Sequence, residues 1–474
     1  MQDVKVSAKT AAADPTRPSA RFGPDSVFWL FLVSLLFLLA EVSHGLLHMP
    51  LGADEITYIA RTSVHQSGVM LPPVHGQGAG LLAAPVTLLT TALVDVRLWM
   101  ALLSAAGLFL SLLCWRGLRP GWVLALAGLI LASMAITQNS GVQIYPDWWS
   151  ALGLLALTGL FLQAMRGLAR QGLILTLIGF ASFVIVVMRP QNIIFVMGPT
   201  IAAALVVRDW RKPKVLAAMA AGIVLGLVEW VIGAYLWFGG LTNRIHLAGQ
   251  EPPSLGLHFS FFRQVKVLSG PWYCQVSIQC KNWNMPGETA WWIALLGFAI
   301  LGVYVVRHRA ERRSSLLAAF SGLWVLVFYS FLVPFGAPRY ILPTWALFSI
   351  LAADAIAWLC TKSRWRTVGI VASCLFVLTG VVTQRIVLNR EVAAQTASRP
   401  YAKYGHDIVR LGIRPPCVMN SAFVGYYVGC SGPWTGQTVD QLLAHPPPGS
   451  NGWRLLRLRH LKPGVSFRIW VPRS

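Results

Sequence analysis

The stretch VFWLFLVSLLFLLAEVSHGLL, residues 27–47, determines the fold class of this chain. Glu41 is its only acidic residue, and it contains neither lysine nor arginine. As an α-helix, a stretch of this length extends about 30 Å, which matches the hydrocarbon core of a bilayer. It is too long for a secretory signal peptide, and no small-residue cleavage site follows it. The stretch therefore predicts a membrane-spanning helix.

Apolar runs of similar length recur along the chain, for example at 215–238, 315–333 and 367–386. Of the 474 residues, 55% are hydrophobic and 12% are charged, whereas about a quarter are charged in a soluble protein. The net charge of +22 has its usual cause in membrane proteins, an excess of Lys and Arg in cytoplasmic loops, rather than nucleic-acid binding. The composition predicts an all-α, multi-pass protein of the inner or plasma membrane.

Clusters of Lys and Arg set the predicted orientation, because cytoplasmic loops are enriched in these residues. The clusters lie at 5–21, 116–119, 166–170, 208–214, 307–313 and 362–366, whereas the short loop 139–147 has no basic residue. This asymmetry predicts a cytoplasmic N-terminus. Eleven spans then satisfy every cluster, at 27–47, 97–115, 121–138, 148–165, 171–187, 191–207, 215–238, 289–306, 315–333, 340–360 and 367–386.

The apolar stretch 79–94 is left out of that count, because a further span there would invert every later loop. Pro72, Pro73 and the glycines at 76, 78 and 80 interrupt the chain around its start, so we expect a juxtamembrane or re-entrant helix on the outer side. The outer loops of the predicted transmembrane catalytic domain (27–387) are then 48–96 and 239–288.

Both ends of the chain are predicted to lie outside the membrane domain. Residues 1–26 are rich in Ala, Pro and Ser and are expected to be disordered and cytoplasmic. Residues 388–474 are expected to form a small extracytoplasmic α/β domain, with a helix near 405–411 and a strand beginning at 415–419. Cys274 and Cys280, and Cys417 and Cys430, are candidate disulfide pairs if these segments face an oxidising compartment.

The chain has only seventeen acidic residues, so the position of each is informative. Asp54 and Glu55 follow the first span in GADEITY (52–58), and Asp147 lies in YPDWW (145–149). The predicted topology brings both loops to the outer face. Paired carboxylates there could share a proton, bind a divalent cation or deprotonate an acceptor hydroxyl. Alternatively, each aspartate caps the helix that follows it.

Arginines at the outer ends of spans are the second group of candidates. Arg189 lies between two spans in MRPQ (188–191), and Arg339 opens another in PRYILP (338–343). A boundary arginine can simply extend its charge to the lipid headgroups, or it can bind a phosphate through two parallel N–H bonds. His75 is one of several histidines in the first loop, which could form a metal site but more commonly line the membrane interface.

These motifs resemble those of the GT-C superfamily of membrane glycosyltransferases. The pattern is most similar to glycosyltransferase family 39, with the protein O-mannosyltransferases, and to the aminoarabinose transferases that modify lipid A. Four motifs over roughly residues 27–386 carry the resemblance: Asp54-Glu55-x-x-Tyr58, Tyr145-Pro146-Asp147, Arg189-Pro190 and Arg339-Tyr340-x-Leu342-Pro343.

The resemblance implies transfer of a sugar from a polyprenyl-phosphate donor to an acceptor hydroxyl at the outer face, with inversion. The acceptor would be a lipid, a glycan or a protein. Asp54 would be the general base, while Glu55 and Asp147 would position the acceptor or hold a divalent cation. The leaving phosphate would be bound by Arg189, Arg339 and Tyr340, and Tyr58 and His75 would contact the substrate or a metal.

One departure from the family pattern lies in the first loop. Some relatives carry Lys-Pro-Pro where this chain has LPPVH (71–75), so no lysine role is transferred. Two alternatives to an enzyme remain open. A transporter or flippase of lipid or polysaccharide predicts internal repeats and helices broken within the membrane; a non-enzymatic scaffold would bind a cell-wall polymer through its outer C-terminal segment.

Overall fold

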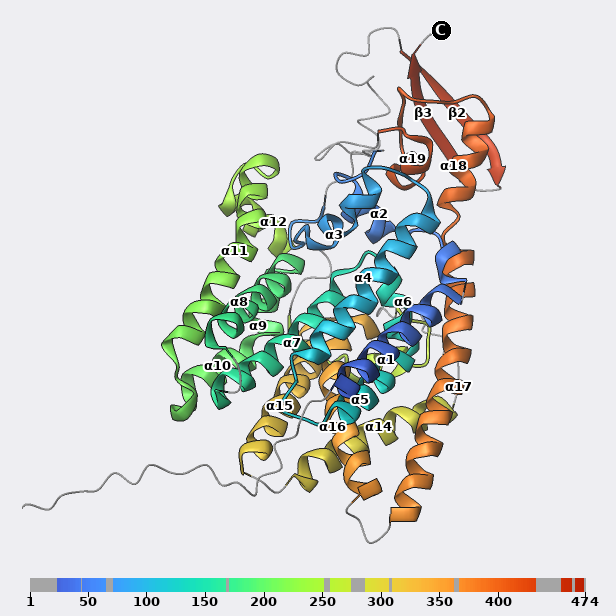
Figure 1. Ribbon diagram of the computed structural model, residues 1–474. Coiled ribbons are helices and arrows are strands. Elements are labelled where there is room, and N and C mark those ends of the chain that lie inside the picture. Colours follow the sequence, from blue (N-terminus) through green and yellow to red (C-terminus); the bar gives the residue numbers. More distant parts are fainter. Residues whose placement is uncertain are drawn as a thin grey trace, which may run out of the picture.

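The computed structural model describes residues 24–43, 45–64, 71–167, 170–250, 256–273, 286–306, 309–361, 366–431, 453–462 and 465–472. The expected disordered segment 1–26 falls almost entirely outside these residues, as does the candidate pair Cys274 and Cys280. The described chain forms a bundle of long helices, with a small domain standing beyond one end of it (Figure 1). We call this the domain end of the bundle.

The bundle is built from helices whose apolar runs the sequence predicts. Its long helices are α1 (Pro24–Ser43), α4 (Leu93–Leu113), α5 (Gly121–Ser133), α7 (Pro146–Arg166), α8 (Gln171–Met188), α11 (Pro213–Trp237), α14 (Pro286–Val305), α15 (Arg309–Leu332), α16 (Leu342–Thr361) and α17 (Arg366–Ser398). Shorter ones are α2 (Ala53–Ile59), α3 (Gly78–Thr87), α6 (Ala135–Val142), α9 (Asn192–Phe195), α10 (Gly198–Val206), α12 (Leu241–Gln250) and α13 (Phe261–Val267), with 3-10 turns η1 (Leu46–His48), η2 (Arg208–Trp210) and η3 (Pro338–Ile341).

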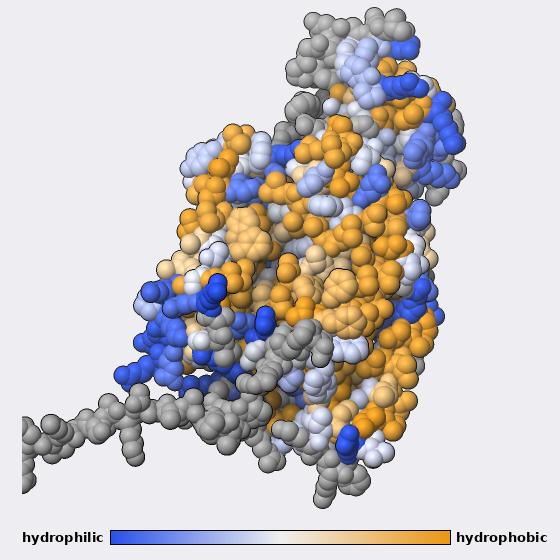
Figure 2. All heavy atoms as spheres, viewed as in Figure 1, coloured by the Kyte–Doolittle hydropathy of each residue, from blue (hydrophilic) through white to orange (hydrophobic). Residues whose placement is uncertain are grey.

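Two helices form the centre of the bundle. In α7 and in the span formed by η3 and α16, 83% of the apolar segment is buried, compared with 22% in α11. Helix α7 packs against α4, α8 and α16, and α16 packs against α5, α14, α15 and α17. The apolar side chains of the outer helices are exposed over a broad area of the visible face (Figure 2). Such a surface suits lipid, so the chain is a multi-pass membrane protein.

The predicted number of eleven spans is not confirmed. The described residues contain eight helices long and apolar enough to cross a membrane, or nine if α5 and α6, which bend by 78° at their junction, count as one. Helix α1 is not among them: its apolar part, Val27–Ser43, has 17 residues and belongs to the shorter apolar helices. The bend between α5 and α6 is the type of broken helix that the transporter alternative predicts.

The predicted span 191–207 consists of two short helices, α9 and α10, rather than one long helix. The neighbouring helices α8 and α11 nevertheless run parallel, because Gly222 packs on Gly179 and Gly226 packs on Val186. Two parallel helices that follow each other in sequence require the chain to return between them. We infer that α9 and α10 make this return across the bundle.

The stretch 79–94 does not form a single helix. Helix α3 ends at Thr87, and α4 begins at Leu93. Ten residues of α-helix rise about 15 Å, which is half of a bilayer core. Helix α3 packs against α2 and α4, so it covers the domain end of the bundle.

Basic clusters meet at the opposite end of the bundle. Arg313 pairs with Asp209 at 2.9 Å, and Arg119 pairs with Asp354 at 2.8 Å. Lys212 donates a hydrogen bond to the carbonyl of Ala164 at 2.8 Å. Four clusters that the sequence assigns to the cytoplasm therefore lie on one side, as a single orientation requires; which side that is stays a prediction.

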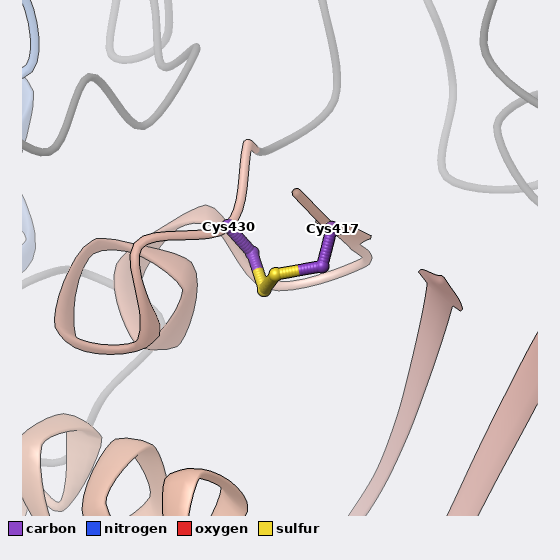
Figure 3. The surroundings of a disulfide bond; sticks show 2 residues. All are labelled: Cys417 and Cys430. Carbon is purple, nitrogen blue, oxygen red and sulfur yellow. A yellow bond between two sulfur atoms is a disulfide. The ribbon is translucent and has the colours of Figure 1, made fainter. Parts of the chain in front are cut away.

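The C-terminal domain contains a mixed helix and strand structure, as predicted. It comprises α18 (Tyr401–Arg410), β1 (Val418–Met419), α19 (Ala422–Val428), β2 (Trp453–Lys462) and β3 (Val465–Pro472), with antiparallel strands in the order β1-β3-β2. A disulfide joins Cys417 to Cys430 on either side of α19 (Figure 3). Helix α17 continues unbroken past residue 387, where the sequence placed the domain boundary, and ends at Ser398.

Candidate active site

Four charged side chains from distant parts of the chain form one network at the domain end. Asp54 pairs with Arg339 at 3.0 Å. Asp147 lies 3.2 Å from Arg189 and 3.5 Å from the Nε of Arg339. The network therefore alternates acid and base in the order Asp54, Arg339, Asp147, Arg189. Its formal charge is zero.

Local sequence explains how each element presents its charge. Asp147 follows Pro146 in the first turn of α7, where proline suits the helix start and a carboxylate suits the positive end of the helix dipole. Arg189 ends α8 with an extended backbone, at φ −154° and ψ 119°, the conformation that a following proline favours. Arg339 lies in η3, the tight turn before α16.

The four side chains differ in exposure. Asp147 and Arg189 are buried, at 4% and 6%, whereas the side chain of Asp54 is 52% exposed. The Nε atom of Arg189 is buried and has no hydrogen-bond partner in the described chain, and the buried ion pair between Asp147 Oδ2 and Arg339 Nε lacks hydrogen-bond geometry. Buried polar atoms are usually paired, so the network has unused hydrogen-bonding capacity. Its solvent-facing member is Asp54.

Aromatic rings support both arginines. The guanidinium carbon of Arg189 lies 4.8 Å from the ring centre of Tyr340, and that of Arg339 lies 4.3 Å from the ring centre of Tyr145. Tyr340 in turn stacks on Tyr329 at 5.1 Å. Burial raises the pKa of Tyr145 to about 12, so its phenol stays neutral. Cation–π contacts of this kind hold an arginine in place without neutralising it.

Glu55 lies apart from this network, although it adjoins Asp54 in sequence. It is fully buried and forms an ion pair with Arg97, which is also fully buried. The backbone N–H groups of Gly52 and Ile144 donate to it at 2.8 and 2.9 Å. Burial alone would raise the pKa of Glu55, but Arg97 and Arg399 hold it below its usual value. These contacts correct the expectation that Glu55 meets an acceptor or a cation, because its oxygens are already occupied.

Two arginines of this buried cluster were not among the candidates from the sequence. Arg97 also donates to the carbonyls of Met49 and Val142, and Arg399 donates to the carbonyl of Pro50 at 3.0 Å. Arg97 begins a predicted span, which is the same signal that singled out Arg189 and Arg339. Arg399 carried no such signal, because it lies in the C-terminal segment.

Tyr58 and His75 lie beside the network and contact each other, with ring centres 5.4 Å apart. Burial raises the pKa of Tyr58, so the phenol stays protonated. Burial lowers the pKa of His75 well below its usual value, and the positive charges of Arg189 and Arg339 lower it further. His75 is therefore neutral at physiological pH and retains one ring nitrogen as an acceptor.

The loop that carries His75 is held by Arg244 of α12. Arg244 is 1% exposed and donates to the carbonyls of Pro73 at 3.0 Å, His75 at 2.9 Å and Trp230 at 2.5 Å. Glu229 accepts a hydrogen bond from the backbone of Gln77 at 3.1 Å. Burial lowers the pKa of Arg244 to about 10, which leaves it charged at neutral pH. We call these contacts the Arg244 clamp.

A metal site was one expectation for this region. Among the residues that the structure describes, no group of three or more His, Cys, Asp or Glu side chains is arranged to hold a metal ion. Arg339 lies between Asp54 and Asp147 and contacts both. A divalent cation held by both carboxylates would have to displace that guanidinium.

Solved structures of other proteins share the fold of this chain. No family model matches the chain, and no curated protein matches it in sequence. Among solved structures, ArnT from Cupriavidus metallidurans bound to undecaprenyl phosphate matches with a TM-score of 0.62 and 16% identity, covering 89% of this chain and 88% of that one. The same protein in its apo state matches with a TM-score of 0.58 and 15% identity, covering 88% of each chain.

The chain has an ArnT-like fold. The match includes nearly nine-tenths of each chain. The predicted fold, an all-α membrane bundle with a small C-terminal domain of helices and strands, is therefore confirmed. At this level of identity, the roles of individual residues rest on the geometry of this chain.

Proposed function

We propose that this protein is a glycosyltransferase that moves a sugar from a polyprenyl-phosphate donor to an acceptor hydroxyl, at the outer face of the membrane. The observation that carries the proposal is the contact between Asp54 and Arg339, which are 285 residues apart in sequence and 3.0 Å apart in space. In this contact a carboxylate that reaches solvent lies beside a guanidinium, a group that suits phosphate binding. The undecaprenyl phosphate bound to ArnT, a protein of the same fold, supports the donor class.

The proposed reaction is a single displacement. The acceptor oxygen attacks the anomeric carbon of the sugar while Asp54 removes the hydroxyl proton. The bond between that carbon and the phosphate oxygen breaks, and its electron pair remains on the polyprenyl phosphate. Attack from the face opposite the leaving group inverts the configuration of the anomeric carbon. The products are the glycosylated acceptor, the lipid phosphate and protonated Asp54.

The arginines have a separate role, stabilising the leaving phosphate. The buried Nε–H of Arg189 has no acceptor in the described chain, and that of Arg339 has only the carboxylate of Asp147 at 3.5 Å. A guanidinium can bind two phosphate oxygens at once. When phosphate binds Arg339, the carboxylate of Asp54 loses its partner and becomes available as a base. Asp147 would stay behind the arginines and keep their charge directed at the phosphate. Tyr340, which touches both guanidinium groups, would fix their planes.

Glu55 and the tyrosine–histidine pair have supporting roles in this proposal. The Glu55–Arg97 pair fixes the start of α2 and so the position of Asp54. Tyr58, protonated, would donate a hydrogen bond to the donor, and neutral His75 would accept one. Both Asp54 and Asp147 contact Arg339 in this structure. A divalent cation would therefore bind these carboxylates only together with the donor phosphate, which would take Arg339 as its own partner.

The test is turnover of polyprenyl-phosphate sugars by the purified protein, with a panel of sugars and acceptors. Asp54→Asn should lower transfer by about 10²-fold or more, because a positioned base contributes factors of that size. Asp95→Asn is the matched control, since Asp95 is an exposed carboxylate at the start of α4, at the same end of the bundle. Undiminished transfer by folded Asp54→Asn protein would exclude the proposed base.

The transporter alternative has one feature in its favour, the bend between α5 and α6. Its test is movement of a labelled polyprenyl-phosphate sugar across proteoliposome membranes. Translocation without any transfer by wild-type protein would favour the transporter and overturn the enzyme proposal. Transfer that depends on Asp54 would do the reverse.

A further inference from the structure

The hairpin formed by β2 and β3 is strongly basic. Residues 453–474 contain six Lys and Arg residues and no Asp or Glu. No ion pair involves a described side chain of this hairpin. Such a concentration of one charge creates a local potential that attracts anions.

The register of the hairpin places two of these charges side by side. Arg457 is directly opposite Arg468 across the strands, and Leu455 is opposite Trp470. Residues opposite each other and residues two apart on a strand point to the same face. Trp453 therefore shares this face with both arginines. We call the residues Trp453, Leu455, Arg457, Arg468 and Trp470 the Arg–Trp face.

The other face of the sheet is already used in the core of the domain. Phe467 and Ile469 are buried and belong to the same apolar cluster as Ile408 of α18 and Val424 of α19. On the Arg–Trp face, by contrast, Arg457 is exposed, and Trp453, Arg468 and Trp470 are half-buried. Like charges directly opposite each other on a sheet are destabilising. A bound anion would remove that repulsion.

We propose that the Arg–Trp face binds an anionic carbohydrate polymer. The two arginines would bind its sulfate, phosphate or carboxylate groups through charge-assisted hydrogen bonds. The ring of Trp453 would pack against the apolar face of a sugar ring. From Trp453 to Arg457 the face extends about 13 Å along the strand, which is long enough for more than one sugar unit.

The position of the hairpin favours a polymer over the membrane surface. The apolar part of α17 ends near residue 386, and the helix continues to Ser398, a further rise of about 18 Å. The sheet lies beyond that end of the helix (Figure 1). If the membrane surface lies at the end of the apolar part of α17, the sheet stands beyond the headgroups, where a flexible polymer reaches the Arg–Trp face more readily than lipid does.

The domain that carries the face is fixed to the candidate active site. Tyr427 of α19 accepts a hydrogen bond from the backbone N–H of Leu51 at 3.2 Å, just before α2. Ser63 donates to the hydroxyl of Tyr426 at 3.3 Å. A polymer bound on the sheet would thus be held near Asp54. Binding itself does not require the proposed transfer reaction, so the two proposals can fail separately.

The test measures binding of the full-length protein, in nanodiscs of neutral lipid, to immobilised dextran sulfate and to uncharged dextran of the same length. We expect binding to dextran sulfate only, weakened by added salt, because exposed charges are screened. Arg457→Ser/Arg468→Ser should weaken it by about tenfold or more, since each lost arginine removes hydrogen bonds to a charged group.

The control removes the same amount of charge elsewhere in the domain. Arg410 ends α18 and Arg414 lies in the loop before β1; both are exposed and neither belongs to β2 or β3. Arg410→Ser/Arg414→Ser should therefore leave binding within about twofold, since only screened, longer-range charge is lost. Equal losses in the two double variants would show non-specific attraction and overturn the proposal. So would equal binding of uncharged dextran, or a face that binds phosphatidylglycerol vesicles but not dextran sulfate. Thermal unfolding of each variant verifies that it is folded.

Discussion

Asp54 and Glu55 are neighbours in sequence, yet their surroundings give them different chemistry. The side chain of Asp54 is half exposed and contacts one arginine, so it can exchange that partner for another. Glu55 is fully buried and bonded to Arg97, Arg399 and two backbone N–H groups. One turn of helix therefore carries a carboxylate available for chemistry and another that stabilises the structure.

Neutralising Glu55 should destabilise the protein strongly. In Glu55→Gln, the guanidinium of Arg97 stays buried without its counter-charge, which costs about 3–5 kcal/mol. The expected result is a large fall in the unfolding temperature measured in detergent. The double variant Glu55→Met/Arg97→Met should recover part of this loss, because the fully buried guanidinium is removed together with its counter-charge, while Arg399 still loses its carboxylate partner. A single variant as stable as wild type would show that the pair contributes little.

Arg339→Lys should remove most transfer activity while leaving the fold intact. A lysine keeps the charge but cannot bind two oxygens of a phosphate in one plane, and the loss of such a group typically costs about 10²-fold or more in rate. The measurement is kcat for a polyprenyl-phosphate sugar. Wild-type kcat in a folded Arg339→Lys protein would exclude the phosphate-binding role.

His75 should make the protein less stable as the pH falls. Its pKa is lower in the folded state than in the unfolded state, so its stabilising effect is complete above the unfolded value of about 6.5 and is lost as pH decreases below it. The unfolding temperature of wild type should fall between pH 7.5 and 5.5 by more than that of His75→Gln. The cost is about 1.4 kcal/mol per pH unit at most. Equal shifts in the two proteins would contradict the neutral state of His75.

At the level of elements, the candidate site depends on short segments held by buried side chains. The loop from Pro72 to Gln77 has no regular structure, and the Arg244 clamp fixes it to α11 and α12. Gly76 and Gly78 pack directly on the carbonyl of Val187 at the end of α8. A side chain at either glycine would collide with this backbone. The loop is thereby fixed next to Arg189.

Arg244→Met should release this loop. Three carbonyls lose the Arg244 donor. Pro73 keeps the indole N–H of Trp230 at 2.9 Å, but the carbonyl of His75 loses its guanidinium partner, and a buried carbonyl left unpaired costs about 1–3 kcal/mol. We expect a lower unfolding temperature and faster proteolysis within 71–77. His246→Ala is the matched control, because His246 is exposed on the same helix. Equal proteolysis of the two variants would mean that the clamp does not order the loop.

For the whole molecule, orientation in the membrane is the main prediction still to be tested. The basic clusters gather at the end opposite the candidate site, so the site should face outward. In a background without the cysteines outside the 417–430 disulfide, Ser398→Cys should react with an impermeant thiol reagent in intact cells. Thr367→Cys, at the other end of α17, should react only after permeabilisation. The reverse pattern would invert the topology and place the site in the cytoplasm.

Much of the fold follows from local sequence. Apolar run length predicted most of the long helices, because a bilayer requires apolar segments of a set length. It failed where the helix is interrupted, at the bend between α5 and α6 and at the break between α9 and α10. The bend between α5 and α6 lies within an apolar stretch, so composition alone does not reveal it, whereas Gly198 and Pro199 mark the start of α10. The length of α17 beyond residue 387 was missed because its second half is amphipathic rather than apolar.

The sequence by itself determined that the chain is a multi-pass membrane protein and which charged residues deserve testing. Both conclusions follow from the high cost of placing charge in lipid, which makes every charge at a span boundary informative. The tertiary structure decided which charges meet. In the folded chain Asp54 pairs with Arg339, which lies 285 residues away, whereas its neighbour Glu55 pairs with Arg97. Ion pairs between distant segments depend on how helices pack, and no local pattern encodes that.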